Sequence, residues 1–549
     1  MERFSFEDID LINNENDCLC SSKIFVTQTR HQIKDLDNLP IPDRSLVDYA
    51  KYSEFIGISM VKNTIVIQAT RGCPYKCAYC HKIWPKTHVV RSAEHIFNEV
   101  KLYYDMGYKR FAFIDDIFNL DSKNSSDFFN MVIDNGLKIH IFFPNGIRGD
   151  ILTKEYIDLM VKAGVVEVPL ALETASPRLQ KLIGKNLVIE KLSENAKYIA
   201  QKYPHVILEL FTIHGIPTET EEEANMTIEF IKSIEWLHFP YVNILRLYPN
   251  TELADIAIEN GVTQEQIERA IPLAFHEIPD TLPFSKGFTR SYQSKIMYEY
   301  ILNKERLLKV IPFQRKIMTE DEVVQKYDSY LPIKISSFDE LLSIVGITRD
   351  ELDTEGFIGD DFGAVANPNN KMEEFFGIKQ SNTDALRILF LDLSQFFLSE
   401  NTNKLYDLVE TPLGHMYLLT YLYNKLGSKV QGKIAKSRID FDSYEELKTL
   451  IDDFKPDVIG IRTLTYHKDF FHNVISLIRQ WGVEGPIIAG GPYATSSYET
   501  LLKDKNVDLA ILGEGEKTLC EIIEKIIDNN NKLPDRETLE KIQGIAFAY

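Results

Sequence analysis

Cysteine is scarce in this sequence and unevenly placed. The 549 residues contain six cysteines, too few for a disulfide-stabilised fold of this length. No apolar stretch is long enough to cross a bilayer, and the first residues, MERFSFEDIDLINNENDCLC, show no charged-then-apolar targeting pattern. The sequence therefore predicts a cytoplasmic protein that has no membrane-spanning segment and no membrane partner.

Positive charge is also in short supply. Lys and Arg number 61 against 81 Asp and Glu, the formal net charge is −20, and no basic run is present. Such a chain repels polyanions, so nucleic acid is not an expected partner. The hydrophobic fraction of 44% is ordinary for a globular protein, and the length predicts more than one domain.

The order of apolar runs predicts an α/β fold. Residues 1–60 are polar and irregular and read as an N-terminal lead-in segment, with the prolines of KDLDNLPIPD disfavouring regular structure. Residues 61–255 alternate short apolar runs with amphipathic stretches, which predicts a partial (β/α)6 barrel. Its six strands are expected at 64–69, 110–114, 139–143, 165–170, 206–213 and 242–247.

The second half of the chain predicts an extension and then another α/β domain. Residues 256–380 are charged and helix-prone and end in the breaker-rich GDDFGAVANPNNK, which indicates a helical extension and linker. The βα alternation resumes near Leu386. Residues 381–549 are therefore expected to form a doubly wound, flavodoxin-like sheet.

Half of the cysteines lie within eight positions. Cys73, Cys77 and Cys80 follow the first predicted strand directly, at the rim where a βα barrel carries its active site. Thiolates are the usual ligands of iron–sulfur clusters, which normally take four. Three cysteines on one loop therefore predict a [4Fe–4S] cluster with one iron open to another ligand.

A structural zinc is the alternative for this loop. His81 or the pair Cys18 and Cys20 could complete four ligands, and the protein would then be a zinc-stabilised binding scaffold without turnover. Zinc sites usually place their ligands in two separated pairs, which favours the cluster. No role is assigned to Cys18, Cys20 or Cys520.

The cysteine loop resembles the radical SAM superfamily, whose defining spacing is Cys-x3-Cys-x2-Cys. The likeness continues through AFIDDIF at 112–118, ALETASPRLQKLIGK at 171–185, HGIPTETEEE at 214–223 and LRLYPNTEL at 245–253, as in cobalamin-associated members. The resemblance implies that the open iron binds S-adenosylmethionine (SAM). It also implies that the reduced cluster cleaves SAM to a 5′-deoxyadenosyl radical, with an electron donor such as flavodoxin or ferredoxin.

By the same resemblance, acidic residues at strand ends contact SAM. Asp115 and Asp116 occupy the loop that meets the SAM amino group, although acidic residues could equally cap the following helix. Glu173 closes the fourth strand near the ribose or methionine moiety. A charge at the end of that apolar strand needs a partner or a rim position.

Three further residues are candidates with simpler alternatives. Arg148 can meet a carboxylate of the ligand, although a solvent-facing salt bridge is the simpler interpretation. Gly215 and Pro217 would let the backbone approach the adenine, but a plain turn explains them too.

Residues 386–549 resemble the cobalamin-binding domain that accompanies many radical SAM cores. The shared phrases are PLGHMYLLTYLYNKLG at 412–427, KPDVIGI at 455–461, AGGPYAT at 489–495 and GEGEKTL at 513–519. In the usual proteins this domain comes first, and its last strand leads into a DLD.LP.P segment. Here QGIAFAY ends the chain and KDLDNLPIPD stands near its start, so the order looks permuted or split.

Two features depart from the cobalamin-binding pattern. DLSQFF after the first strand lacks the Asp-x-His-x-x-Gly motif, which predicts binding without an axial histidine; His415 and His467 are expected to be surface or helix-packing residues. Arg462 stands where a small residue is usual. Gly490 and Gly491 still suit close approach of a ligand.

The resemblance implies a cobalamin-dependent methylation or rearrangement of a small-molecule substrate. The alternative is a radical SAM enzyme whose C-terminal domain is degenerate, binds no cobalamin and serves docking or stability. Arg462 favours that alternative.

Overall fold

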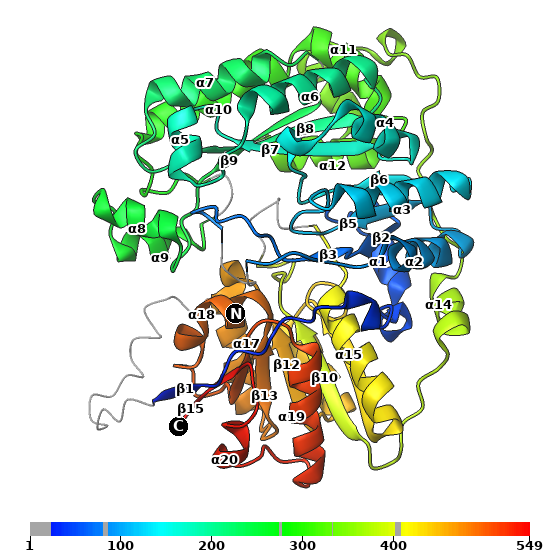
Figure 1. Cartoon of the computed structure of the whole chain (residues 1–549), viewed down its shortest axis with the longest axis vertical. Coiled ribbons are helices and arrows are strands. Elements are labelled where there is room, and N and C mark those ends of the chain that lie inside the picture. Colours follow the sequence, from blue (N-terminus) through cyan, green and yellow to red (C-terminus); the bar gives the residue numbers. More distant parts are fainter. Residues whose placement is uncertain (1–22, 81–85, 236, 274–276, 332, 401–407) are drawn as a thin grey trace.

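The computed structural model describes residues 23–80, 86–235, 237–273, 277–331, 333–400 and 408–549. Figure 1 shows an upper part, the barrel (residues 64–244) with its helical extension, and a lower part, the C-terminal module (residues 386–549). Cys18, Cys20 and His81, the extra ligands a zinc site would need, lie outside the described residues. Within the described ranges no helix is long and apolar enough to span a membrane.

The barrel consists of two parallel three-stranded sheets that meet edge to edge. Their orders are β2-β5-β6 and β7-β8-β9, and parallel bridges at Ile141–Val165 and Ile147–Leu170 join the two halves. Each strand overlaps a predicted one, so the partial (β/α)6 barrel is confirmed. The strands are β2 (Thr64–Ile67), β5 (Arg110–Phe113), β6 (His140–Phe142), β7 (Glu167–Glu173), β8 (Ile207–His214) and β9 (Phe239–Ile244).

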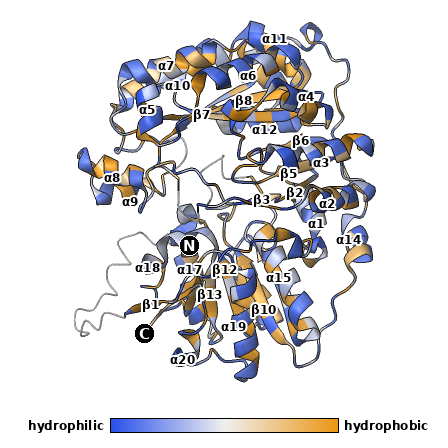
Figure 2. Cartoon of the chain, in the orientation of Figure 1, coloured by the Kyte–Doolittle hydropathy of each residue, from blue (hydrophilic) through white to orange (hydrophobic). Residues whose placement is uncertain are grey.

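The helices between these strands follow from caps and an apolar stripe. In α2 (Ala93–Asp105), the Ser92 hydroxyl accepts a hydrogen bond from the His95 backbone, and Ile96, Val100 and Tyr103 share one buried face. Figure 2 shows the result, with strands mostly hydrophobic and helices mixed. The other barrel helices are α3 (Ser122–Asp134), α4 (Lys154–Lys162), α5 (Pro177–Leu182), α6 (Ile189–Lys202) and α7 (Glu221–Lys232).

Part of the helical extension covers the amino ends of the barrel strands. Arg110 at the start of β5 pairs with Glu322 at 2.7 Å, and both side chains are fully buried. Lys326 pairs with Glu167 at the start of β7 at 2.9 Å. The carboxyl ends, where barrels bind ligands, lie at the opposite end. The extension comprises α8 (Glu252–Glu259), α9 (Gln264–Ala270), α10 (Lys286–Ile296), α11 (Lys304–Gln314), α12 (Glu320–Tyr330), α13 (Phe338–Ile344) and α14 (Pro368–Phe376).

The C-terminal module is the doubly wound sheet predicted. Its parallel strands lie in the order β11-β10-β12-β13-β14, the flavodoxin-like arrangement, with β15 antiparallel beyond them. The strands are β10 (Leu386–Asp392), β11 (Val430–Lys436), β12 (Val458–Arg462), β13 (Ile487–Gly490), β14 (Leu509–Ile511) and β15 (Ile545–Ala548). The helices are α15 (Leu413–Leu426), α16 (Tyr444–Phe454), α17 (Lys468–Gln480), α18 (Gly491–Leu501), α19 (Glu516–Asp528) and α20 (Arg536–Leu539).

The N-terminal segment adds an edge strand to this C-terminal sheet. β1 (Ile24–Val26) pairs antiparallel with β15, so segments more than 500 residues apart lie side by side (Figure 1). The chain then passes through KDLDNLPIPD into the short helix α1 (Tyr49–Ser53) and the barrel. The last strand of the module therefore neighbours the segment that enters the barrel. These two segments are thus adjacent in space, although they stand at opposite ends of the chain.

Candidate active site and interdomain cavity

The cysteine loop begins at a tight turn after β2. β3 (Thr70–Arg71) pairs antiparallel with β4 (Val89–Val90), and Gly72 follows with φ +84°. A Cβ on Gly72 would stand 2.5 Å from the carbonyl oxygen of Thr87. Only glycine tolerates both the left-handed conformation and this approach, so Gly72 sets the path of the loop.

The middle of the loop is fixed by the barrel and its extension. The Ala78 backbone N–H donates to the Ile183 carbonyl at 2.8 Å, and the Leu253 N–H donates to the Ala78 carbonyl at 2.9 Å. A Cβ on Gly184 would lie 2.9 Å from the Lys76 carbonyl oxygen. Backbone hydrogen bonds to the barrel and to its extension thus hold the segment between the second and third cysteines from two sides.

The three thiols of the cysteine loop lie at the barrel rim. Cys73 and Cys77 are half-buried and Cys80 is exposed. Burial raises the pKa of Cys73, and the neighbouring Cys77 raises it further. Within the described ranges no three His, Cys, Asp or Glu side chains are gathered closely enough to hold a metal ion. The soft thiol donors nevertheless fit an iron–sulfur cluster, since metal binding commonly completes such sites.

Asp115 and Asp116 hold the start of the loop and do not cap a helix. α3 is capped by Asp121, so the helix-cap alternative is wrong. One oxygen of buried Asp115 accepts hydrogen bonds from the backbone of Ala69 and from the backbone and hydroxyl of Thr70. Exposed Asp116 accepts from the Gly72 N–H at 3.1 Å. Both carboxylates therefore position the segment that precedes Cys73.

Asp115→Asn should stabilise the apoprotein near neutral pH. Burial raises the pKa of Asp115 to about 7, whereas an unfolded aspartate titrates near 3.9. Between these values the native state binds more protons than the unfolded chain, so this group's contribution to the free energy of unfolding falls as pH rises from about 4 to about 7, by at most about 4 kcal/mol. Asparagine keeps an acceptor oxygen without the charge.

Thermal unfolding midpoints of both proteins at pH 5 and pH 8 measure this effect. The variant should gain clearly more stability over the native protein at pH 8 than at pH 5. An identical pH dependence in the two proteins would contradict the assignment.

Glu173 joins the end of β7 to the cysteine loop. It lies at an irregularity in the β7–β8 register with φ +66°, a conformation that costs free energy for any residue with a side chain. Its carboxylate accepts from the Tyr79 hydroxyl at 3.0 Å and pairs with Lys185 at 2.5 Å. Burial and the charge of Glu173 raise the pKa of Tyr79, so the phenol remains a donor. A strained, buried carboxylate thus binds Tyr79, the residue that precedes Cys80 in the chain.

Arg148 is buried, so the solvent-facing interpretation is wrong. Its guanidinium binds both Asp150 oxygens, at 2.9 and 3.1 Å, and the carbonyl oxygens of Lys185 and Asn186, each at 3.2 Å. It also lies 4.1 Å from the Tyr75 ring centroid. Arg148 therefore supports the turn that carries Lys185 and packs against the cysteine loop.

The turn around Gly215 and Pro217 encloses a carboxylate that sequence patterns do not single out. Oε2 of buried Glu219 accepts from the N–H groups of Gly215 (2.6 Å) and Ile216 (3.1 Å), and burial raises the Glu219 pKa to about 7. A Cβ on Gly215, which has φ +94°, would lie 2.4 Å from a methyl of Leu282. The close approach that requires glycine here is to Leu282 of the extension.

A cavity of about 270 Å³ lies between the barrel and the C-terminal module. It sits at the carboxyl ends of β10, β12, β13 and β14, and it includes the point where the strand order reverses between β10 and β12. The barrel contributes Gln68, Arg71 and Ile114 to its wall. A ligand in this cavity would therefore touch both parts of the protein.

The two glycines at this cavity differ in the space that surrounds them. A Cβ on Gly490 would meet no atom within 4 Å, whereas one on Gly491 (φ +82°) would lie 2.8 Å from Cγ of Arg462. Arg462 pairs with Asp392 at 3.0 Å, and Lys436 approaches the same carboxylate at 3.3 Å. Although burial opposes it, these two cations hold the Asp392 pKa well below its usual range. Arg462 thus occupies the switch point as part of an ion-pair network.

His415 and His467 are both buried, so the predicted surface position is wrong for both. The other predicted role, helix packing, is compatible with their burial. His415 lines the cavity beside Phe390, with ring centroids 5.2 Å apart, and burial lowers its pKa to about 4. His467 packs against Phe396, with centroids 4.6 Å apart, and is not among the cavity-lining residues.

Arg71 connects the cysteine loop to the cavity. It pairs with Glu514 at 3.0 Å and Glu516 at 2.6 Å, and its guanidinium lies 5.5 Å from the Tyr417 ring centroid. Sequence patterns could not reveal this pairing, because 443 residues separate Arg71 from Glu514.

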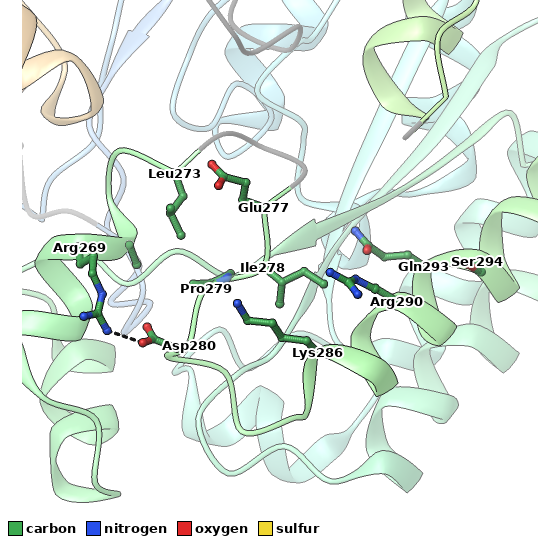
Figure 3. A pocket seen from close by; sticks show the side chains of 11 residues that line it. Arg269, Leu273, Glu277, Ile278, Pro279, Asp280, Lys286, Arg290, Gln293 and Ser294 are labelled. Atoms are coloured by element: carbon green, nitrogen blue, oxygen red, sulfur yellow. Dashed lines mark hydrogen bonds and ion pairs between the residues drawn. The ribbon is translucent and has the colours of Figure 1, made fainter. Parts of the chain in front are cut away.

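A wider pocket of about 650 Å³ opens between α9 and α10 (Figure 3). Arg269 pairs with Asp280 at 2.5 Å at one side of it, and Lys286 and Arg290 of α10 lie along another. None of the site residues expected from the sequence lines this pocket.

Comparisons with known proteins match both parts of the chain. Residues 67–231 match the model of the radical SAM superfamily, and residues 406–523 match that of the B12 binding domain. The expected order, with the B12-binding part second, is confirmed. The first match implies a [4Fe–4S] cluster and SAM, and the second implies cobalamin.

Individual relatives align over parts of their length. The chain is 30% identical to an uncharacterized methyltransferase of Pyrococcus horikoshii, over 42% of this chain and 49% of the relative. It is 26% identical to the anaerobic magnesium-protoporphyrin IX monomethyl ester cyclase of Rubrivivax gelatinosus, over 52% and 51%. The chain thus spans about half the length of these curated relatives. Among solved structures, the radical SAM methyltransferase TsrM from Kitasatospora setae aligns at 16% identity and TM-score 0.34, over 39% of this chain and 41% of that chain.

Proposed function

We propose that this chain, which carries a radical SAM domain followed by a B12-binding domain, is a cobalamin-dependent radical SAM enzyme that methylates a small molecule. One observation carries the proposal: the cysteine loop and the interdomain cavity share a wall. Arg71 lines the cavity and stands two residues before Cys73. A cluster on the loop and a corrinoid in the cavity would therefore adjoin, as a reaction that uses both requires.

Residues of the cysteine loop and of β7 would bind the cluster and SAM. Cys73, Cys77 and Cys80 would hold three irons and leave the fourth open for SAM. When bound, the cofactors supply one-electron cleavage of SAM and a carrier for a methyl group. Glu173, fixed by Tyr79 and Lys185, presents a carboxylate next to the cysteine loop, where it could accept hydrogen bonds from the amino or ribose hydroxyl groups of SAM.

Methyl transfer is favoured over rearrangement by the names of the relatives. They include the Pyrococcus methyltransferase and the cytidylyl-2-hydroxyethylphosphonate methyltransferase of Streptomyces wedmorensis. The buried, largely apolar wall at the carboxyl ends of the module strands suits a reaction from which water must be kept away.

The degenerate-domain alternative rests on the size of the cavity and on Arg462. Sites for drug-sized ligands usually measure about 300–1,000 Å³, and a corrinoid is larger than such ligands. At about 270 Å³ the cavity is smaller than such sites, and this small size favours the degenerate-domain alternative.

Anaerobic reconstitution tests the proposed function. The protein, loaded with iron, sulfide and hydroxocobalamin and then desalted, should retain a corrinoid absorption spectrum and release 5′-deoxyadenosine from SAM after reduction. Retention of the cluster without any corrinoid would support the degenerate-domain alternative. Absence of SAM cleavage from cluster-loaded protein would contradict the radical SAM assignment.

Arg462→Ser should bind hydroxocobalamin at least as tightly as the native protein. The substitution removes the side chain that covers Gly491, while Lys436 still neutralises Asp392. A titration followed by absorbance measures the affinity. Weaker binding would show that Arg462 contacts the corrinoid favourably, whereas binding by the variant alone would support the degenerate-domain alternative.

The remaining partners follow from the chemistry. The cluster must be reduced before it can cleave SAM, so the protein needs a low-potential electron donor such as flavodoxin or ferredoxin. Three thiols that must stay reduced to bind a cluster also favour a location in the reducing cytoplasm.

A further inference from the structure

Three segments of the chain meet at two glutamates beside the cavity. Glu514 accepts from Arg71 at 3.0 Å and from the Ile33 backbone N–H at 2.6 Å, and Glu516 accepts from Arg71 at 2.6 Å. Nε of Arg71 donates to Gln68 at 3.0 Å. The guanidinium therefore ties the end of β2 to the module, and Glu514 ties the module to the N-terminal segment.

This cluster of charges is enclosed by protein. The side chains of Arg71, Glu514 and Glu516 are 5%, 8% and 6% exposed. All three also line the interdomain cavity. A ligand that enters the cavity must contact or displace these charges, because they form part of its wall.

The other side of Arg71 leads directly to the cluster ligands. Only Gly72, whose backbone is constrained by the Thr87 carbonyl and by Asp116, separates Arg71 from Cys73. A shift of the Arg71 backbone would reach the Cys73 thiol through this short, constrained connection.

Resting on the function proposed above, we propose that Arg71 is the positioning residue that couples occupancy of the cavity to SAM binding at the cluster. Corrinoid in the cavity fixes the wall that contains Arg71, and this orders the start of the cysteine loop. The coupling is positive and reciprocal, since linkage requires SAM to raise corrinoid affinity by the same factor. Coupling of this kind usually amounts to at least about fivefold.

The test compares SAM dissociation constants of the cluster-loaded protein with and without saturating hydroxocobalamin. The native protein should bind SAM at least about fivefold more tightly with the corrinoid, and Arg71→Met should bring the ratio to about one. Arg30→Met is the matched control, because Arg30 also pairs with a glutamate of α19, Glu521, but does not line the cavity. It should keep the native ratio.

A single Arg71 substitution leaves two buried glutamates without their cation and could impair folding. The combination Arg71→Met, Glu514→Gln, Glu516→Gln removes the pairs without that charge and should also give a ratio of about one. Iron content and circular dichroism verify that each protein is folded and loaded.

A native ratio in either Arg71 variant would overturn the proposal, and so would a ratio of one in native protein that binds both cofactors. Failure of the native protein to retain any corrinoid is a different result, visible as a missing absorption spectrum. That result would overturn the proposed cobalamin dependence and, with it, the coupling.

Discussion

Replacing Cys73, Cys77 and Cys80 together with alanine should reduce bound iron from about four atoms per chain to none and abolish SAM cleavage. The three thiols are the proposed donors at the barrel rim, and backbone hydrogen bonds to Ile183 and from Leu253 hold the loop without any metal. The variant should therefore fold and lack only the cluster. Iron and sulfide assays and chromatography of 5′-deoxyadenosine measure the two losses.

Cys520→Ala is the control for this experiment. Cys520 is a buried thiol on α19 that packs in the module core, away from the loop. Its replacement should leave iron content and SAM cleavage unchanged. A full cluster in the triple variant, or one tetrahedral zinc in the native protein, would contradict the central assignment.

Glu173→Gln should weaken SAM binding by on the order of 10- to 100-fold, because a hydrogen bond to a charged group contributes about 1.5–3 kcal/mol. The variant keeps the size of the side chain but loses the charge that attracts Lys185 and a donor group of SAM. The Lys185 ammonium, left without its buried partner, would also disturb the site. A SAM titration of cluster-loaded protein measures the loss.

Arg148→Ala should lower SAM affinity less than Glu173→Gln. Its guanidinium donors bind Asp150 and backbone carbonyls of 185–186, so its removal acts on stability before it acts on the ligand. Glu223→Gln offers the same chemical change at a carboxylate that pairs with Arg178, and it should leave SAM affinity unchanged. An equal or larger loss of affinity with Arg148→Ala would show that the SAM pocket lies elsewhere.

Local sequence patterns predicted the elements but not all their contacts. The six barrel strands and the doubly wound sheet were recognisable because burial on both faces requires continuous apolar runs. The roles of Asp115 and Asp116 were not, since an acidic pair before a helix is compatible with a cap. The structure shows Asp121 as the cap and leaves the pair to bind the backbone of 69–72.

The sequence by itself predicted the chemistry of this protein. Three cysteines at a fixed spacing on one loop predict the donor set without any distant contact. The tertiary structure alone decided which distant groups meet that loop. The pairing of β1 with β15, of Arg71 with Glu514 and of Glu173 with Tyr79 depends on how the two sheets pack. Local patterns carry no information about such pairs, because the residues involved are brought together only when the apolar faces of separate elements are buried against each other.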